Sequence, residues 1–140
     1  MVAVRKRRLS KLKRIAISMG NRVFSDSVYL MLKRTGDFRP FVIPALPPGN
    51  IVQDCKNADA EILLMDVTPN MPQLDLAGRL KIITEMHKEM PGCKIVLLCD
   101  EVAYPELARD VMRTKQVGQI DGFFYASVTG DYLTAALDAL

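Results

Sequence analysis

Short apolar runs alternate along this chain with longer segments in which apolar residues recur every three or four positions. An apolar run bounded by turn residues is typical of a strand buried on both faces, as in parallel sheets. Recurrence every three or four positions predicts an amphipathic helix instead. The predicted strands span residues 13–18, 39–46, 62–66, 94–99 and 122–125.

Capping and turn residues give bounds for the five predicted helices that follow these strands. Either Asn21 or Ser25 can cap the first helix, and Gly36 is suited to end it. Pro105 is suited to the first turn of the fourth helix. The first predicted helix follows either Asn21 or Ser25 and ends at about residue 34, and the last one follows either Ser127 or Thr129 and continues to residue 140. The three helices between them span residues 50–57, 74–90 and 105–116.

The third predicted helix carries its apolar residues on one stripe. His87 is the only histidine of the chain, and it falls inside this helix, far from any strand end. A lone helical histidine is more typical of packing or of the surface than of a catalytic base, so we expect no enzyme activity. The expected buried stripe consists of Leu76, Leu80, Ile83 and either Met86 or His87.

Five strand–helix units in succession predict an α/β fold with a parallel sheet covered on both faces. Right-handed crossovers leave few possible topologies. The flavodoxin-like (βα)5 three-layer sandwich with strand order 2-1-3-4-5 places the second strand at an edge. That strand contains Pro40 and Pro44, which cannot donate hydrogen bonds to a neighbour, so its sequence agrees with an edge position.

Charge is distributed unevenly along the 140 residues, a length that suits one domain. The first fourteen residues hold seven of the nineteen basic residues and no acidic residue. We therefore expect a disordered basic arm over residues 1–12, followed by a single domain over residues 13–140. The basic segment 5–14 is also a candidate contact for nucleic acid or for an acidic partner.

The three cysteines have no spacing that is typical of a metal site. An odd number of cysteines without such a pattern indicates reduced thiols and a cytoplasmic protein. No run of eighteen apolar residues occurs, so no membrane span is expected.

Asp66 follows four consecutive apolar residues at the end of the third predicted strand. In open α/β sheets, ligands collect at the carboxyl ends of the strands, where the strand order reverses. The predicted topology places the end of the first strand beside Asp66, and Cys99, Asp100 and Glu101 on its other side. Asp66 is thus either the central residue of a site or an ordinary turn residue that ends a strand.

Two segments resemble a known family when their order and spacing are taken together. Residues 62–68 (ILLMDVT) resemble the phosphoacceptor strand of response-regulator receiver domains. Residues 121–131 (DGFFYASVTGD) resemble the fifth-strand segment of receivers that precede a LuxR-type helix-turn-helix output domain. The resemblance covers the chain from residue 13 to 140. It implies that Asp66 is the candidate phosphoacceptor.

Four of the five groups that the family's chemistry uses are replaced here. The acidic pair that helps to hold Mg²⁺ corresponds to Met19 and Gly20. The hydroxyl residue after the fourth strand corresponds to Cys99, and the lysine after the fifth strand corresponds to Ala126. The resemblance is therefore to a degenerate receiver. A single carboxylate provides too few ligands for Mg²⁺, which usually needs a second carboxylate or substrate phosphates as well.

The main hypothesis is a receiver-like domain of a two-component response regulator that signals without phosphorylation. It would bind protein partners, form a homodimer and serve a transcription regulator, with no cofactor. A linked DNA-binding output domain would then follow Leu140. In this interpretation Arg22 would pair with Asp66 and replace the structural role of the metal.

Two alternatives stay open. In the first, Asp66 still accepts phosphate, with Mg²⁺ held in part by Asp100 or Glu101. In the second, the switch point binds a flavin or a nucleotide, although no glycine-rich phosphate-binding motif is present. The residues expected around this pocket are Met19, Gly20, Arg22, Thr68, Cys99, Asp100 and Ala126.

Overall fold

The computed structural model of the chain describes residues 11–140. The predicted basic arm lies almost entirely outside the described residues and stays a prediction. Within them, five strands alternate with five α-helices, and a short 3-10 helix precedes the second helix. The elements are β1 (Lys13–Ser18), α1 (Arg22–Thr35), β2 (Phe38–Val42), η2 (Pro48–Asn50), α2 (Ile51–Ala58), β3 (Ile62–Asp66), α3 (Leu76–Glu89), β4 (Lys94–Cys99), α4 (Pro105–Gln116), β5 (Gly122–Tyr125) and α5 (Gly130–Asp138).

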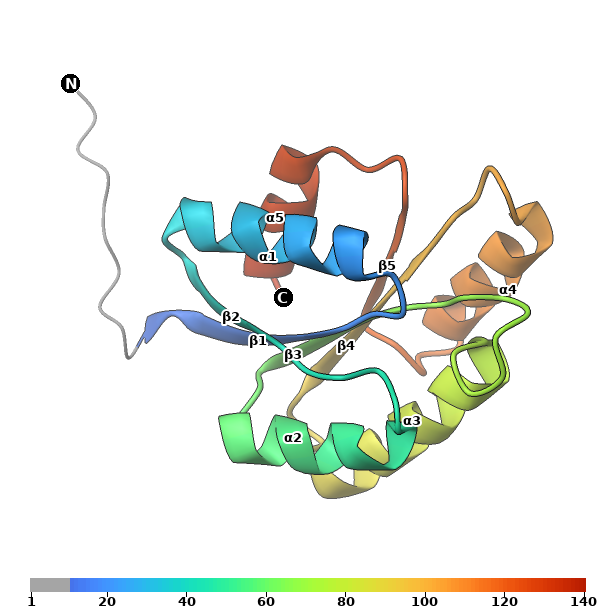
Figure 1. The fold of residues 1–140 in the computed structure, drawn as a ribbon, viewed down its shortest axis with the longest axis horizontal. Coiled ribbons are helices and arrows are strands. Elements are labelled where there is room, and N and C mark those ends of the chain that lie inside the picture. Colours follow the sequence, from blue (N-terminus) through green and yellow to red (C-terminus); the bar gives the residue numbers. More distant parts are fainter. Residues whose placement is uncertain (1–10) are drawn as a thin grey trace.

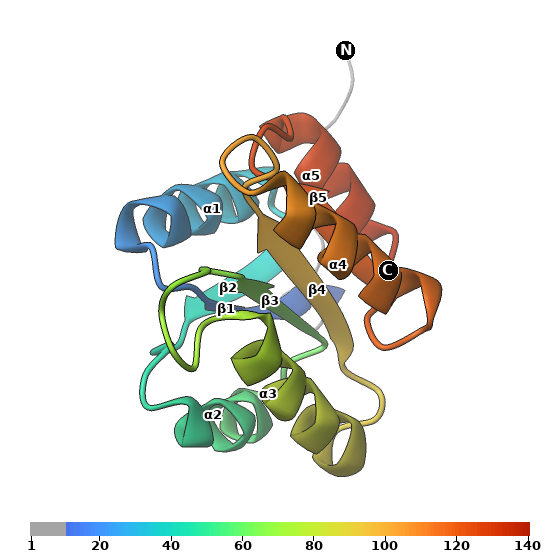
Figure 2. The ribbon, with the colours of Figure 1, turned by 90° about the vertical axis from the view of Figure 1, so that its right-hand side faces the viewer.

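The five strands form one parallel sheet in the order β2-β1-β3-β4-β5. Helices α1 and α5 cover one face of this sheet, and α2, α3 and α4 cover the other (Figure 1). Figure 2 shows the same layers from the side on which α4 lies. The predicted flavodoxin-like fold and its strand order are confirmed. None of the described helices has the length and apolar character that crossing a membrane requires.

Two hydrophobic cores, one on each face, explain why the central strands are apolar throughout. In β3, Ile62 and Leu64 point toward α1 and α5, whereas Leu63 and Met65 point toward α2, α3 and α4. Successive strand side chains alternate between faces, so a strand covered on both sides needs apolar residues at every position. This arrangement leaves Asp66 as the polar end of an otherwise apolar strand.

Strand β2 lies at the sheet edge, as its prolines predicted. The Lys13 N–H donates to the Asp37 carbonyl and the Ile43 N–H donates to the Ile17 carbonyl, so odd-numbered residues bond to β1. Pro40 therefore falls on the outer side, where its missing N–H costs no ladder hydrogen bond. The strand ends at Val42, so the predicted extension to residue 46 is wrong, and Pro44 lies in the following loop.

Local caps set the helix bounds. Asn21, and not Ser25, caps α1, because its side chain accepts a hydrogen bond from the Phe24 N–H at 3.0 Å. Gly36 ends this helix in the left-handed region with φ 74°, as expected. Helix α3 begins two residues later than predicted, because the Asp75 carboxylate caps it through the Gly78 N–H at 2.8 Å.

The buried face of α3 differs from the predicted stripe. Ile83 and Met86 are buried as expected, but His87 is exposed and Leu76 and Leu80 are only partly buried. A charged residue one turn before Ile83, Arg79, is fully buried instead, with 0% of its surface exposed.

Candidate functional site

The predicted switch-point residues do gather at the carboxyl edge of the sheet. Asp66 ends β3 and lies beside the turn that connects β1 to α1. A hollow of about 540 Å³ opens there, and a second hollow of about 490 Å³ adjoins it on the β2 side. Met19, Gly20 and Arg22 line the second hollow. Among the predicted residues, the first hollow is lined by Gly20, Asp66, Thr68, Cys99, Asp100 and Ala126.

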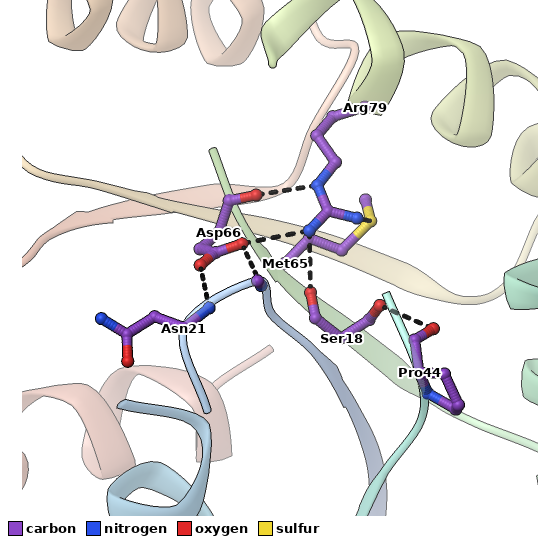
Figure 3. Close-up of polar contacts among 7 residues, drawn as sticks. Ser18, Asn21, Pro44, Met65, Asp66 and Arg79 are labelled. Atoms are coloured by element: carbon purple, nitrogen blue, oxygen red, sulfur yellow. Dashed lines mark hydrogen bonds and ion pairs between the residues drawn. The ribbon is translucent and has the colours of Figure 1, made fainter. Parts of the chain in front are cut away.

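The Asp66 side chain pairs with Arg79 of α3. The guanidinium Nη2 lies 3.0 Å from Asp66 Oδ1, and Nε donates to the Asp66 backbone carbonyl at 2.8 Å (Figure 3). Charge-assisted hydrogen bonds of this kind are roughly twice as strong as neutral ones. The cation that Asp66 contacts is therefore part of the protein.

Two backbone N–H groups complete the surroundings of the Asp66 carboxylate. The Gly20 N–H donates to Oδ1 at 3.0 Å and the Asn21 N–H donates to Oδ2 at 3.3 Å. Both residues immediately precede α1, where the helix dipole favours negative charge. Asp66 is thus an anion bound by a helix N-terminus and by an arginine, and its side chain is only 11% exposed.

Arg79 joins the ends of two neighbouring strands, β1 and β3. Its Nη2 also donates to the Ser18 carbonyl at the end of β1, at 3.1 Å, and its Nη1 lies 3.6 Å from Met65 Sδ. Burial lowers the pKa of the Arg79 guanidinium, while the charge of Asp66 opposes this effect. A guanidinium stays protonated in proteins, so Arg79 keeps its positive charge beside Asp66.

The expected pairing of Arg22 with Asp66 is wrong. Arg22 is the first residue of α1 and is exposed, and the guanidinium that contacts Asp66 belongs to Arg79. The sequence does contain a signal for Arg79, because it precedes Ile83 by four positions and Met86 by seven. A charged residue in register with a buried apolar stripe indicates a buried ion pair.

The positions that correspond to the family's hydroxyl and lysine residues, Cys99 and Ala126, offer no phosphate-binding side chain. Burial raises the pKa of the Cys99 thiol to about 11, and a neutral thiol is a weak donor. Ala126 has no polar side-chain atom. Asp100 Oδ1 accepts the backbone N–H groups of residues 102 and 103, so this side chain stabilises its own loop. The Glu101 carboxylate accepts a hydrogen bond from Ser127 and joins the loops after β4 and β5.

These residues do not fit the Mg²⁺ ion that the resemblance implies. Among residues 11–140, no group of three or more His, Cys, Asp or Glu side chains is placed to hold a metal ion. A divalent cation at Asp66 would also face the Arg79 charge across one carboxylate. A Cβ atom at Gly20 would approach Leu74 Cδ1 to 3.0 Å, so the space for an acidic side chain there is already tight.

Comparisons with known proteins identify the fold. No protein-family model matches the chain, and no curated protein is similar to it at a significant level. The signal receiver domain of NarL from Mycobacterium tuberculosis is 14% identical, with a TM-score of 0.67 over 91% of this chain and 94% of that chain. RcsB from Salmonella enterica serovar Typhimurium, bound to the rprA promoter in the presence of the phosphomimetic BeF3−, is 17% identical with a TM-score of 0.68, over 91% and 67%.

A third structure with this fold carries a different description. A Burkholderia pseudomallei protein provisionally described as pilus assembly-related is 18% identical, with a TM-score of 0.68 over 96% of this chain and 93% of that chain. The chain therefore has the fold of receiver domains, and it shares this fold with proteins of different described roles.

Proposed function

We propose that the chain is a receiver-like signalling domain that acts through protein contacts without phosphorylation of Asp66. The observation that carries this proposal is the ion pair between Asp66 and the fully buried Arg79. It supplies internally the positive charge that a working receiver takes from a metal ion.

The chemistry of phosphoryl transfer explains why this pair matters. A carboxylate nucleophile needs a free oxygen and a cation that neutralises the incoming phosphoryl group. Asp66 Oδ1 already accepts two hydrogen bonds, from Gly20 and Arg79. All three nitrogens of the Arg79 guanidinium already contact protein atoms, so none is left to neutralise an incoming phosphoryl group.

The wider role follows the family resemblance. The domain would belong to a response regulator of the two-component type and would contact protein partners, including a second copy of itself. Structures with the same fold include RcsB dimers bound to DNA. By analogy, a DNA-binding output domain would follow the receiver-like domain. The cytoplasm is the compartment that suits such a protein.

One observation favours the alternative in which Asp66 accepts phosphate. Asp66 Oδ2 accepts a single hydrogen bond, from Asn21 at 3.3 Å, and it borders the hollow that Asp100 also lines. The volume of this hollow is also in the range of small-ligand sites, as the flavin or nucleotide alternative requires.

The phosphorylation-independent proposal and the phosphoacceptor alternative make opposite predictions for the same experiment.

The test is fluorine NMR of the folded chain with beryllofluoride and Mg²⁺, which together mimic an aspartyl phosphate. We expect no protein-bound fluorine resonance, while a working receiver measured in parallel gives one. A bound resonance that disappears in Asp66→Asn would overturn the proposal and establish Asp66 as a phosphoacceptor. Absorption spectra of the purified protein would reveal a bound flavin or nucleotide.

A further inference from the structure

The carboxyl edge of the sheet exposes large apolar side chains at the place where a working receiver needs polar groups. Surface patches of this kind mark interaction sites in soluble proteins. Most of the large apolar side chains that the described residues expose lie here. They are Val23, Val42, Leu46, Met71, Val102, Tyr104 and Tyr125.

Met71 lies at the centre of this edge. It is 42% exposed, and it lines both the hollow of about 540 Å³ and the hollow of about 490 Å³. On the β2 side, the apolar lining includes Val42 and Leu46. On the β4 side, it includes Phe24 and Tyr104. We call these five residues the Met71 patch.

Opposite charges flank the Met71 patch. Arg22 lines the hollow on the β2 side, and Asp100 lines the hollow on the β4 side. Within residues 11–140, neither side chain forms an ion pair, and both are exposed. Helix α1 has no acidic residue in its first turn, so the positive end of its dipole adds to the Arg22 charge.

This distribution of charge is self-complementary. A two-fold axis near Met71 would bring the β2 side of one copy against the β4 side of the other. Apolar residues would then meet apolar residues, and Arg22 of each copy would face Asp100 of the other. Two symmetric ion pairs would form from one surface, whereas an unrelated partner would have to provide both charges in the matching order.

We propose that a second copy of this chain docks on the Met71 patch and forms a two-fold dimer. This inference rests on the proposed function, because a phosphoacceptor must keep the same edge open to its phosphodonor. The dimer closes both hollows and covers Asp66. It therefore gives a constitutive association that no phosphorylation step controls.

Sedimentation velocity over a range of protein concentrations tests the dimer. The wild-type chain of 15.6 kDa should sediment with twice this mass at the higher concentrations. Met71→Glu places a charge at the centre of the patch and should give a monomer. Val117→Glu is the matched control, because Val117 is 71% exposed at the C-terminal end of α4 and should leave the dimer intact.

Charge exchange tests the orientation of the two copies. Arg22→Glu should weaken the dimer by about tenfold, because each of two symmetric pairs becomes repulsive. The same change places an acid in the first turn of α1, so the monomer should melt at a higher temperature. This combination separates loss of association from loss of folding. Asp100→Lys should weaken the dimer similarly, and the double variant should restore it to within about threefold of the wild type.

Two outcomes would overturn the inference. One is a wild-type chain that stays monomeric up to about 1 mM. The other is a dimer that survives Met71→Glu but dissociates in Tyr132→Glu, a change on the exposed face of α5. Sedimentation reports association and fluorine NMR reports chemistry at Asp66. Because the dimer covers Asp66, the fluorine spectrum of the monomeric Met71→Glu variant keeps the two results distinguishable.

Discussion

At the scale of single residues, one ion pair changes the interpretation of Asp66. The position of this carboxylate at a strand end was predictable, because four apolar residues precede it. The partner of Asp66 was not predicted correctly. The prediction named Arg22, which follows β1, but this side chain is exposed. Arg79 reaches Asp66 because α3 packs on the sheet with this residue facing β3.

Removing the guanidinium should destabilise the fold strongly. Arg79→Met leaves the Asp66 carboxylate buried without its cation, which should lower the unfolding free energy by roughly 3–5 kcal/mol. Urea unfolding followed by circular dichroism measures this change. In Asp66→Leu/Arg79→Met both charges are absent, and an apolar pair of similar volume should recover most of the loss. A loss below 1 kcal/mol in the single variant would show that the pair is no more than a surface contact.

At the scale of elements, the start of α3 positions the ion pair. Asp75 caps the helix, and Arg79 lies four residues later, so its N–H donates to the Asp75 carbonyl. Gly78 lies between them, close to the backbone of Gln73, which has φ 75°. A Cβ atom at Gly78 would come within 2.3 Å of the Gln73 carbonyl oxygen, so this turn requires glycine.

Alanine at position 78 should therefore destabilise the protein, although alanine normally favours a helix more than glycine does. Gly78→Ala gains up to about 1 kcal/mol of helix propensity, but the clash moves backbone and should cost more than this gain. We expect a net destabilisation of about 1–3 kcal/mol, measured by thermal unfolding. Gly92→Ala is the matched control, because a Cβ there meets nothing within 4 Å and stability should hardly change. A stabilised Gly78→Ala variant would contradict the tight turn.

At the scale of the whole molecule, all three cysteines are buried in one of the two hydrophobic cores, the one between the sheet and helices α2, α3 and α4. Burial raises the pKa of the Cys55 and Cys93 thiols to about 12 and that of Cys99 to about 11. The native protein therefore holds these protons more tightly than the unfolded chain does, whose thiols titrate near 9.0. The thiols therefore make their full contribution to stability below pH 9, and this contribution is lost as the pH rises from there toward 12.

Thiol chemistry gives a measurement of this burial. At pH 8, Ellman's reagent should react slowly with the native protein and fully with all three thiols in denaturant. Urea unfolding at pH 7 and pH 10 should give a lower unfolding free energy at the higher pH. Fast reaction of one thiol in the native state would place that cysteine at the surface.

The sequence by itself determined the architecture. Continuous apolar runs require strands covered on both faces, Pro40 within β2 favours an edge position, and turn residues separate the units, so strand order and layers follow from local pattern. Only the tertiary structure decided which cation neutralises Asp66 and which apolar side chains remain exposed around Met71. These depend on how far each helix is rotated over the sheet and on the paths of the loops. Packing between distant segments sets both. The register of Arg79 with the buried stripe of α3 indicates that this side chain is buried, but it does not indicate that Asp66 is its partner.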